Sequence, residues 1–502
     1  MEWKNLRSGT DVRGTAVGEG ITLTNQVAEH LGYAFACKIA EEKQLPVEQV
    51  RIALGRDSRI TGEALLGAAA NGIRKAGGTA LDFGLCTTPA MYMSIITPGV
   101  TADGSVMITA SHHPWNKNGL KFFKGKGGLE GNEIEKLLEQ AETLSLQETP
   151  LKGDLIRQSF LPVYKQQLAD RIRRGLNTDA EKPLVGLHIA VDAGNGAGGF
   201  YADLMESLGA CITGSQYLDP DGHFPNHIPN PENPDAMKAI QQAVLSSGAD
   251  LGVIFDADCD RAAVVDCDGK QINRNRLIAL ISAILLEIKP NQTIVTDSVT
   301  SAGLKVFIEA HGGEHYRFKR GYRNVIDEAL RLNGEGKNCP VAIETSGHAA
   351  LQENHYLDDG MYLVTVLIVK AMQMKQNGKT LGSMIADLQE PLESKEIRIN
   401  INSEDFRVTG RKAIDLVTEH AERDGAWHIA PDNREGIRIS FDLNGEEDAG
   451  WMLLRLSVHD PVLPLNVESN VQGGVCEMLT ALYGVLKDLD GIDLSGVRAA
   501  LE

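Results

Sequence analysis

Three stretches of the chain share one order of hydrophobic and polar segments. Each has a short apolar run, a loop rich in Gly, Asp or Ser, a helical pattern, a glycine stop and a second apolar run; the stretches are residues 50–84, 187–214 and 292–318. Runs such as IAV and TIV are short and β-branched, as buried parallel strands are. The glycine stops stand where a helix ends with positive φ. The pattern therefore predicts three βαβ units, each in a parallel or mixed sheet.

The C-terminal part follows a different pattern. Residues 395–401 (KEIRINI) and 436–442 (GIRISFD) alternate apolar and polar positions, which predicts half-buried strands. A helix is expected after a Ser403 cap, with Asp405 in its first turn, and a second helix is expected near 470–488. This part is expected to form a smaller α+β domain.

These patterns predict an α/β protein of four domains. The first three are expected to have related mixed α/β sheets, the fourth to be the smaller α+β domain, and all four to surround a central cleft, the usual place for a ligand. The expected domains are residues 1–155, 156–269, 270–390 and 391–502. A chain of 502 residues has room for them at about 100–200 residues per domain.

Composition narrows the classes of function. The chain is 42% hydrophobic and 23% charged, which is typical of globular proteins. A net charge of −19 repels phosphate backbones, so no nucleic-acid partner is expected. No apolar run reaches about 18 residues, so no membrane partner is expected, and the N-terminal residues lack the apolar core of a signal peptide. The seven cysteines are scattered without a CxxC pair, which favours a cytoplasmic location.

The sequence DADCDR, residues 256–261, is a candidate metal loop. The apolar run DLGVIF precedes it and AAVVD follows it, so the loop is expected at a strand end. Alternate residues of an extended loop project to one side, so Asp256, Asp258 and Asp260 are expected to converge. Carboxylates that close repel one another by several kcal/mol at low effective dielectric. A divalent cation removes the conflict, and oxygen ligands favour Mg²⁺ or Ca²⁺.

Two other interpretations of this loop are open. An EF-hand also has the spacing D-x-D-x-D, but here Arg261 stands where that loop needs glycine and Cys267 where it needs glutamate. Strands also flank the loop, whereas helices flank an EF-hand. A solvated acidic turn is the other alternative, and the apolar flanking runs argue against it.

The stretch TASHHPWNKNGLKFF, residues 109–123, places Ser111 beside His112 and His113. Ser111 is a candidate hydrolase nucleophile, a candidate carrier of a phosphate, or a turn serine with no chemical role. A hydrolase of the common type needs a G-x-S-x-G elbow, which TASHH is not. A cation held by three aspartates has room for one more oxygen, and a phosphate on Ser111 would supply it. Lys121 could then neutralise a developing oxyanion or move a proton.

The run GNGAGG at 194–199 suggests a different class, a nicotinamide-dependent dehydrogenase. It fits the dinucleotide pattern G-x-G-x-x-G, and Asp219 lies about 20 residues further on. Asp219 falls in the turn-rich YLDPDGHFPNH rather than at a strand end. The glycines are therefore expected to let a helix and a sheet pack closely, and the dehydrogenase is the weaker hypothesis.

Six motifs together resemble those of the α-D-phosphohexomutase superfamily. They occur in family order over nearly the whole chain: SGTDVRG (8–14), GRDSRITG (55–62), TASHHPWNKNGLKFF (109–123), DADCDR (256–261), IETSGHAALQENHYLDDG (343–360) and RLSVHDP (455–461). Any one of these motifs alone is weak, whereas the ordered set is specific. The family has four domains, the first three with a common α/β core, in agreement with the pattern above.

The resemblance implies a role for each matching residue. Ser111 is the phosphorylated serine, and Asp256, Asp258 and Asp260 hold one Mg²⁺ together with its phosphate. The implied catalytic residues are Ser111, Lys121, Arg13 and His112, with Lys121 as acid or base. The implied substrate-binding residues are Arg261 at the transferring phosphoryl group, Glu344, Ser346 and His348 at the sugar hydroxyls, and Arg455 and Ser457 at the non-reacting phosphate. His459, Lys319 and Arg320 are further candidates for phosphate binding that the resemblance itself does not imply.

The chain departs from the family pattern at several positions. His113 replaces an asparagine, His459-Asp460 replaces Thr-Glu, Val299 lies where a lysine is frequent, and Tyr322 lies where a histidine is frequent. A neutral tyrosine is a poor base at pH 7, since its reference pKa is about 10. Lys319, Arg320 or Arg323 could compensate by binding phosphate.

The expected function is therefore that of an isomerase of the phosphoglucomutase/phosphomannomutase type. It would interconvert hexose 1-phosphate and hexose 6-phosphate of glucose, mannose or both, through phospho-Ser111 and a hexose 1,6-bisphosphate that also acts as activator. The expected partner is a phosphorylated hexose, and the expected assembly is a monomer or homodimer. The alternatives are a catalytically altered sugar-phosphate-binding relative, suggested by Tyr322 and Val299, and a phosphoglucosamine mutase.

Overall fold

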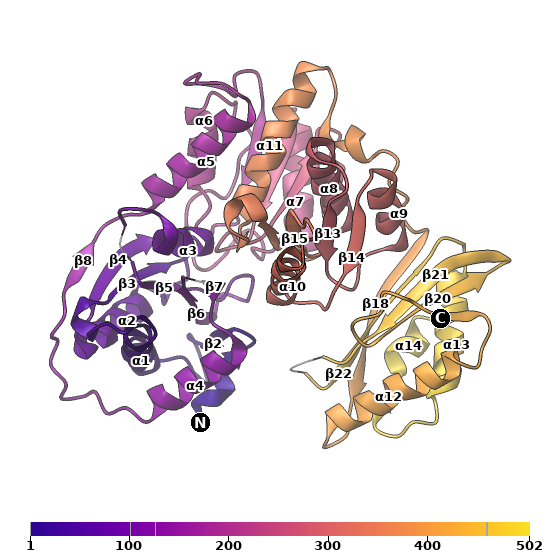
Figure 1. Ribbon diagram of the computed structural model, residues 1–502, viewed down its shortest axis with the longest axis horizontal. Coiled ribbons are helices and arrows are strands. Elements are labelled where there is room, and N and C mark those ends of the chain that lie inside the picture. Colours follow the sequence, from indigo (N-terminus) through magenta and orange to yellow (C-terminus); the bar gives the residue numbers. More distant parts are fainter. Residues whose placement is uncertain (1, 101, 126, 458–459, 502) are drawn as a thin grey trace. The chain divides into compact units, whose positions relative to one another are not determined.

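The computed structural model describes residues 2–100, 102–125, 127–457 and 460–501 of the chain. Figure 1 shows the chain as a ribbon coloured along the sequence. Residue contacts divide the chain into two compact units. The first unit consists of residues 1–273 and 346–383, and the second of residues 274–345 and 384–502. Each unit thus contains segments from more than one of the four expected domains, whose boundaries stay predictions.

A mixed sheet with helices forms the N-terminal part of the first unit. Within the described residues its eight strands run in the order β1-β2-β6-β5-β3-β4-β8, with β7 beside β6. The strands are β1 (Arg7–Ser8), β2 (Asp11–Thr15), β3 (Arg51–Arg56), β4 (Thr79–Leu85), β5 (Gly104–Ile108), β6 (Lys117–Lys124), β7 (Gly127–Gly128) and β8 (Leu155–Arg157). The helices are η1 (Trp3–Leu6), α1 (Asn25–Lys43), η2 (Val47–Gln49), α2 (Gly62–Ala76), α3 (Thr88–Ile96), α4 (Gly131–Glu142) and α5 (Leu161–Gly175).

The first predicted βαβ unit is confirmed in this sheet. Strands β3 and β4 pair in parallel, with α2 between them in sequence. Helix α2 ends at Gly77, whose φ is +113°, as the glycine stop predicts. Strand β5 pairs in parallel with β3 and antiparallel with β6. The loop that contains Ser111 therefore connects the ends of two neighbouring strands in the interior of the sheet.

Helices α1 and α2 pack closely through glycine, which supports a prediction about stability. The variant Gly72→Ala is expected to lower the free energy of unfolding by about 3 kcal/mol. Its Cβ would lie 1.8 Å from the backbone oxygen of Glu29 and 2.8 Å from the backbone nitrogen of Tyr33, and backbone atoms inside a helix have little room to move. Chemical denaturation of the purified variant measures the loss.

The matched control is Gly67→Ala on the same helix. Gly67 is exposed and has no atom within 4 Å of an added Cβ, so the substitution is expected to stabilise the protein by about 0.5–1 kcal/mol through helix propensity. Equal effects of the two alanine variants would show that α1 and α2 do not pack through Gly72 as described.

A second, smaller sheet of the first unit carries the aspartate loop. Its order is β12-β11-β10-β9, with β10 parallel to β9 and antiparallel to β11. The strands of this sheet are β9 (Ile189–Asp192), β10 (Leu251–Phe255), β11 (Ala262–Asp266) and β12 (Gln271–Ile272). The first unit also contains α6 (Phe200–Ser207), α7 (Pro234–Ser247), η3 (Gln352–Asn354), α11 (Gly360–Gln376) and the antiparallel pair β16 (Ala349–Leu351) and β17 (Leu357–Asp358). The predicted strands on both sides of residues 256–261 are confirmed.

The second predicted βαβ unit is only partly correct. Strand β9 and helix α6 lie where expected, but the following apolar run makes only isolated parallel bridges, His188 with Cys211 and Asp192 with Gln216. The glycine loop before α6 packs against its neighbours as predicted. A Cβ on Gly199 would lie 2.0 Å from the backbone oxygen of Leu218, so close packing explains these glycines.

The second unit contains a parallel sheet and an antiparallel sheet. Strand β13 (Thr293–Thr296) pairs in parallel with β14 (Glu314–Arg317) and β15 (Val341–Ile343), which confirms the third predicted βαβ unit. The antiparallel sheet has the order β19-β20-β21-β22-β18-β23. Its strands are β18 (Glu393–Ile401), β19 (Trp427–Ile429), β20 (Ile437–Leu443), β21 (Glu446–Leu454), β22 (Val462–Ser469) and β23 (Ile492–Asp493).

The helices of the second unit complete these two layers. They are α8 (Asn275–Ile288), α9 (Ala302–Ala310), α10 (Tyr322–Gly334), η4 (Leu381–Ile385, at the unit boundary), α12 (Phe406–Ala421), α13 (Gly474–Leu486) and α14 (Ser495–Ala499). Apolar side chains of α12 and α13 form one core with the antiparallel sheet, drawn orange to yellow in Figure 1. The expected cap of α12 was wrong: the Asp405 side chain accepts from the Val408 N–H, while Ser403 donates to Thr409. Among the described residues, every helix is too short or too polar to cross a lipid bilayer.

Candidate active site

The loop between β5 and β6 holds Ser111 in a strained backbone conformation. Its φ is +52°, in the left-handed region that a side chain rarely adopts, and the residue is 2% exposed. The Ser111 N–H donates to Oγ1 of Thr109 over 2.8 Å, and that hydroxyl donates to Asp57 over 2.7 Å. Such strain persists only where surrounding contacts impose it, and it is frequent at functional residues.

Arg59 is the main contact that holds this loop. Its buried guanidinium donates to four backbone carbonyl oxygens, those of Ser111 (2.5 Å), His113 (2.6 Å), Pro114 (2.8 Å) and Lys117 (2.8 Å). Arg59 also forms an ion pair with Asp57, in which Nε of Arg59 lies 3.3 Å from a carboxylate oxygen. Arg59 belongs to the motif GRDSRITG, but the sequence alone predicts no role for it. Its partners are backbone atoms distant in sequence, and no side-chain pattern marks them.

The three aspartates converge as the loop pattern predicts. Asp256 and Asp258 are fully buried and Asp260 is 2% exposed, and one oxygen from each lies within 4.8 Å of the others. Among the described residues, Oδ1 of Asp258 and Oδ1 of Asp260 are buried without a hydrogen-bond partner. Buried carboxylate oxygens without a partner are costly, and three hard oxygen donors match Mg²⁺ or Ca²⁺. The residues therefore fit a divalent cation.

The structure brings Ser111 to these aspartates. The Ser111 hydroxyl donates to Oδ2 of Asp256 over 2.8 Å, and Arg261 donates from Nη2 to Oγ of Ser111 over 3.2 Å. The Nε of Arg261 also donates to Asp256 over 3.2 Å. A phosphate on Ser111 would thus lie beside the carboxylates and beside one buried guanidinium.

Lys121 on β6 neutralises part of the negative charge. Its ammonium donates to Asp258 over 2.8 Å and also to Asp260. Burial disfavours the charged form of Lys121, but the two carboxylates outweigh burial and hold the pKa of the ammonium well above its ordinary value. The ammonium of Lys121 is therefore charged at neutral pH, and its predicted role as acid or base stays a prediction.

The same cluster shifts the pKa of two aspartates in opposite directions. Burial and the neighbouring carboxylates of Asp260 and Asp258 raise the pKa of Asp256 well above its usual range. Burial also disfavours ionisation of Asp260, but Lys121 and its other cationic neighbours outweigh burial and hold the pKa of Asp260 below its ordinary value. The raised pKa of Asp256 reflects burial and repulsion among the three carboxylates, and a divalent cation would relieve that repulsion.

His112 and Arg13 complete the surroundings of the serine. Nδ1 of His112 lies 3.3 Å from Oγ of Ser111. Burial, with the charge of Arg261 next, holds the pKa of His112 well below its ordinary value, so the imidazole is neutral. Arg13 on β2 donates to Asp11 over 2.8 Å, and its Nε is buried without a hydrogen-bond partner in the described part of the chain.

The predicted sugar-binding loop is divided by the unit boundary, which falls between Thr345 and Ser346. Ser346 and His348 belong to the first unit, where His348 forms a bridge with Arg261. Nδ1 of His348 lies 2.6 Å from Asp358. Burial lowers the pKa of His348, but Asp358 and Asp260 outweigh burial and raise it to about 9. Sequence reasoning assigned no role to Asp358, although the quoted motif contains it.

Glu344, Arg320 and Arg455 belong to the second unit. Glu344 accepts from the Gly321 N–H over 2.6 Å. Burial, and next the charge of Arg320, lowers the pKa of Arg455, so the two arginines are electrostatic neighbours. The Nε of Arg455 is buried without a hydrogen-bond partner in the described residues. The two predicted phosphate-binding arginines therefore lie in one region.

The other predicted phosphate-binding residues differ in their placement. Ser457 follows Arg455 and accepts from the Asp460 N–H over 3.2 Å. Lys319 is exposed, with its ammonium 6.0 Å from the centre of the Phe318 ring. His459 lies outside the described residues. Val299, where a lysine was considered, is buried against Trp451 and Leu453, so this position is part of a small apolar core.

Comparisons with known proteins point to one family. Three family models match, described as phosphoglucomutase/phosphomannomutase, alpha/beta/alpha domain I at residues 4–147, domain II at 164–269 and domain III at 273–392. The phosphoglucomutase of Neisseria gonorrhoeae is 30% identical over 474 residues, which is 94% of each chain. The phosphomannomutase of Escherichia coli (strain K12) is 30% identical over 89% of this chain and 93% of its own.

Solved structures have the same fold. A phosphoglucomutase/phosphomannomutase family protein from Burkholderia thailandensis superimposes with a TM-score of 0.80 at 26% identity. The match covers 98% of this chain and 99% of that chain. A protein from Thermus thermophilus superimposes with a TM-score of 0.68 at 19% identity, over 96% of this chain and 98% of its own, which supports the fold alone.

Proposed function

Because the chain belongs to the phosphoglucomutase/phosphomannomutase family, we propose that it is a mutase that interconverts hexose 1-phosphate and hexose 6-phosphate of glucose, mannose or both. The observation that carries the proposal is the hydrogen bond of 2.8 Å from the Ser111 hydroxyl to Asp256. It joins a strained, buried serine to a carboxylate trio that fits a divalent cation. This arrangement supports a serine that carries a phosphate.

The proposed reaction has two transfers through one serine. Phospho-Ser111 gives its phosphoryl group to the free hydroxyl of a hexose monophosphate, whose proton leaves as the new P–O bond forms, and the serine oxygen takes up a proton. The product is a bound hexose 1,6-bisphosphate. The bisphosphate then reverses its orientation in the site. Its other phosphoryl group passes to Oγ of Ser111, and the isomeric monophosphate is released. Free bisphosphate would act as activator by phosphorylating Ser111.

The residues of the first unit have distinct proposed roles in these transfers. Asp256, Asp258 and Asp260 would hold one Mg²⁺, whose charge offsets the negative charge of the phosphoryl oxygens. Arg13 and Arg261 would orient and neutralise the phosphoryl group, since a guanidinium presents a planar fork of donors. Charged Lys121 would donate a proton toward the serine oxygen as the ester breaks. Neutral His112 would help to position the serine oxygen through its Nδ1, which lies 3.3 Å from Oγ.

The sugar and its second phosphate have proposed contacts on other segments. Glu344, Ser346 and His348 would bind the hydroxyls of the hexose, because a carboxylate, a hydroxyl and an imidazole match the donors and acceptors of a vicinal diol. Arg455 and Arg320 would bind the non-reacting phosphate, with help from Ser457, Lys319 and His459. Two phosphate environments are what a reaction with a bisphosphate intermediate needs.

A coupled enzymatic assay tests this proposal. The purified chain with Mg²⁺ and a trace of glucose 1,6-bisphosphate is given glucose 1-phosphate, mannose 1-phosphate or glucosamine 1-phosphate in turn. Turnover of the glucose or mannose compound is the expected result. Turnover of glucosamine phosphate alone would show a phosphoglucosamine mutase, and binding without turnover of any sugar would show a catalytically altered relative.

A further inference from the structure

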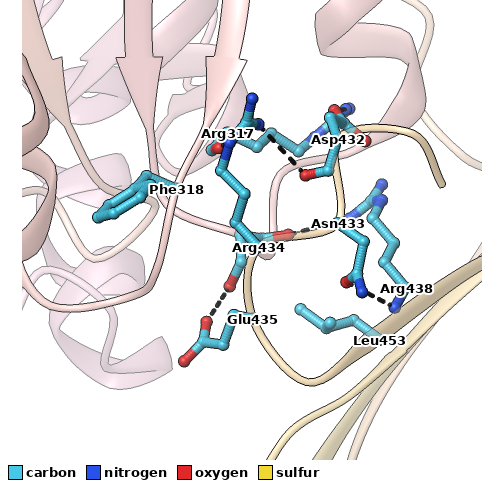
Figure 2. A pocket seen from close by; sticks show the side chains of 9 residues that line it. Arg317, Phe318, Asp432, Asn433, Arg434, Glu435, Arg438 and Leu453 are labelled. Carbon is cyan, nitrogen blue, oxygen red and sulfur yellow. Dashed lines mark hydrogen bonds and ion pairs between the residues drawn. The ribbon is translucent and has the colours of Figure 1, made fainter. Parts of the chain in front are cut away.

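Glu435 occupies hydrogen-bond donors beside the arginines that the proposed function assigns to phosphate. Its Oε2 accepts from the Ser298 hydroxyl over 2.5 Å and from the backbone N–H of Arg320 over 3.1 Å. Figure 2 shows the Glu435 side chain at the edge of a small pocket that Arg434 and Arg438 also line. A hydroxyl and a backbone N–H are common donors to phosphate oxygens, so an acidic side chain holds two donors that suit a phosphate.

Glu435 is an electrostatic neighbour of Arg455 and Asp297, and Arg320 acts on the same two groups. The charges of Arg320 and Glu435 both act on Arg455. Arg320 and Glu435 also affect Asp297. Burial raises the pKa of the Asp297 carboxyl, the charge of Arg320 lowers this pKa, and the charge of Glu435 raises it. Asp297 is fully buried, and its Oδ1 has no hydrogen-bond partner among the described residues. A phosphate dianion that enters this region would meet two carboxylates as well as two guanidinium groups.

The loop that carries Glu435 is firmly held. Asp432 pairs with Arg317 over 2.6 Å. The guanidinium of Arg434 lies 3.9 Å from the centre of the Tyr316 ring and donates to the backbone oxygen of Arg317 over 3.0 Å. These contacts, visible in part in Figure 2, fix the backbone on the N-terminal side of Glu435.

Arg438 holds the loop on its C-terminal side. It is buried and donates to the backbone oxygens of Ser298 (3.0 Å) and Thr300 (3.1 Å). Its guanidinium also lies 3.7 Å from the centre of the Trp451 ring. With the backbone held on both sides, the Glu435 carboxylate is positioned beside Ser298 and Arg320 rather than free to point into solvent.

We propose that Glu435 is an internal anion that competes with the phosphate monoester of the substrate for the donors of Ser298 and Arg320, and so weakens phosphate binding in this subsite. The inference rests on the proposed function, because that function places the non-reacting phosphate beside Arg320 and Arg455. Phosphate binding would displace the carboxylate, and the returning carboxylate would favour release of the phosphate. A moderate affinity suits a reaction in which the bound bisphosphate must change its orientation.

Titration of inorganic phosphate into the full-length chain by isothermal calorimetry tests this inference without requiring turnover. The variant Glu435→Gln keeps the shape of the side chain and removes its charge, so its Kd for phosphate is expected to be about tenfold lower than that of the parent chain. The matched control is Glu447→Gln, the same acid-to-amide change at an exposed position of β21. The Kd of this control is expected to stay within about twofold of the parent value.

Two further variants complete the design. Ser298→Ala removes a donor that phosphate would use and is expected to raise the Kd for phosphate about threefold. This variant tests the subsite even if a thermal melting curve shows that Glu435→Gln is poorly folded. Arg455→Ala identifies the part of the binding that belongs to this subsite. If Arg455→Ala weakens phosphate binding but Glu435→Gln leaves the binding unchanged or weakens it, the inference about Glu435 is wrong. The phosphate contact of the proposed function is unaffected by that result. If Arg455→Ala has no effect, the phosphate contact in the proposed function fails as well.

Discussion

Replacement of Ser111 by alanine is expected to lower kcat for hexose phosphate interconversion by at least about 10³-fold. The reason is chemical: without Oγ the phosphoryl group has no serine oxygen on which to form the covalent ester. Intact-mass measurement and peptide mapping before and after addition of glucose 1,6-bisphosphate give the second reading. The parent chain is expected to gain one phosphate, on the peptide that contains Ser111, and the variant none.

The control for this experiment is Ser145→Ala. Ser145 is exposed in the segment after α4, and its replacement is expected to leave both kcat and the phosphate on Ser111 unchanged. A Ser111→Ala variant that keeps a tenth of the parent turnover, or that still carries the phosphate on the same peptide, would contradict the covalent mechanism. A folded variant is confirmed by a melting temperature close to that of the parent chain.

Removal of divalent cations is expected to have the second large effect on turnover. Chelation is expected to abolish turnover, and added Mg²⁺ to restore it, because three buried carboxylates beside Ser111 need a compensating charge. Mg²⁺ is also expected to raise the melting temperature of the parent chain, since a ligand at 100 times its Kd stabilises the folded state by about 2.7 kcal/mol. In Asp258→Asn both responses are expected to be lost, with kcat lower by about 10²-fold or more.

Asp268→Asn is the matched control for the metal experiment. Asp268 is exposed in the turn after β11, where it accepts from the Lys270 N–H over 2.9 Å. Its replacement removes the same charge near the same sheet but away from the aspartate trio. The control is expected to keep the thermal response to Mg²⁺. An Asp258→Asn variant that responds to Mg²⁺ like the parent would place the cation elsewhere.

Much of the fold was predictable, because the signals are local. Short β-branched runs and glycine stops correctly predicted β3, α2 and β4, and likewise β13, α9 and β14. The prediction failed for the run after α6, which forms only isolated bridges. An apolar run shows that a segment is buried, but pairing along a neighbouring strand depends on residues elsewhere in the chain.

The candidate site was predicted less completely than the fold. The identities of Ser111, Lys121 and the three aspartates came from motifs, and the structure places these residues in contact. The roles of Arg59 and Asp358 were missed. Arg59 acts through backbone oxygens of a distant loop, and Asp358 through an imidazole ten residues away. Neither kind of contact leaves a pattern that a single sequence reveals.

The sequence by itself determined two of the three βαβ units, the family and the aspartate loop between two strands, because each of these is signalled by short local patterns. Only the tertiary structure decided that Ser111 meets Asp256, 145 residues away. It also decided that Lys121 is charged and His112 neutral. Protonation depends on burial and on charges that folding brings close, and no local pattern contains those distances.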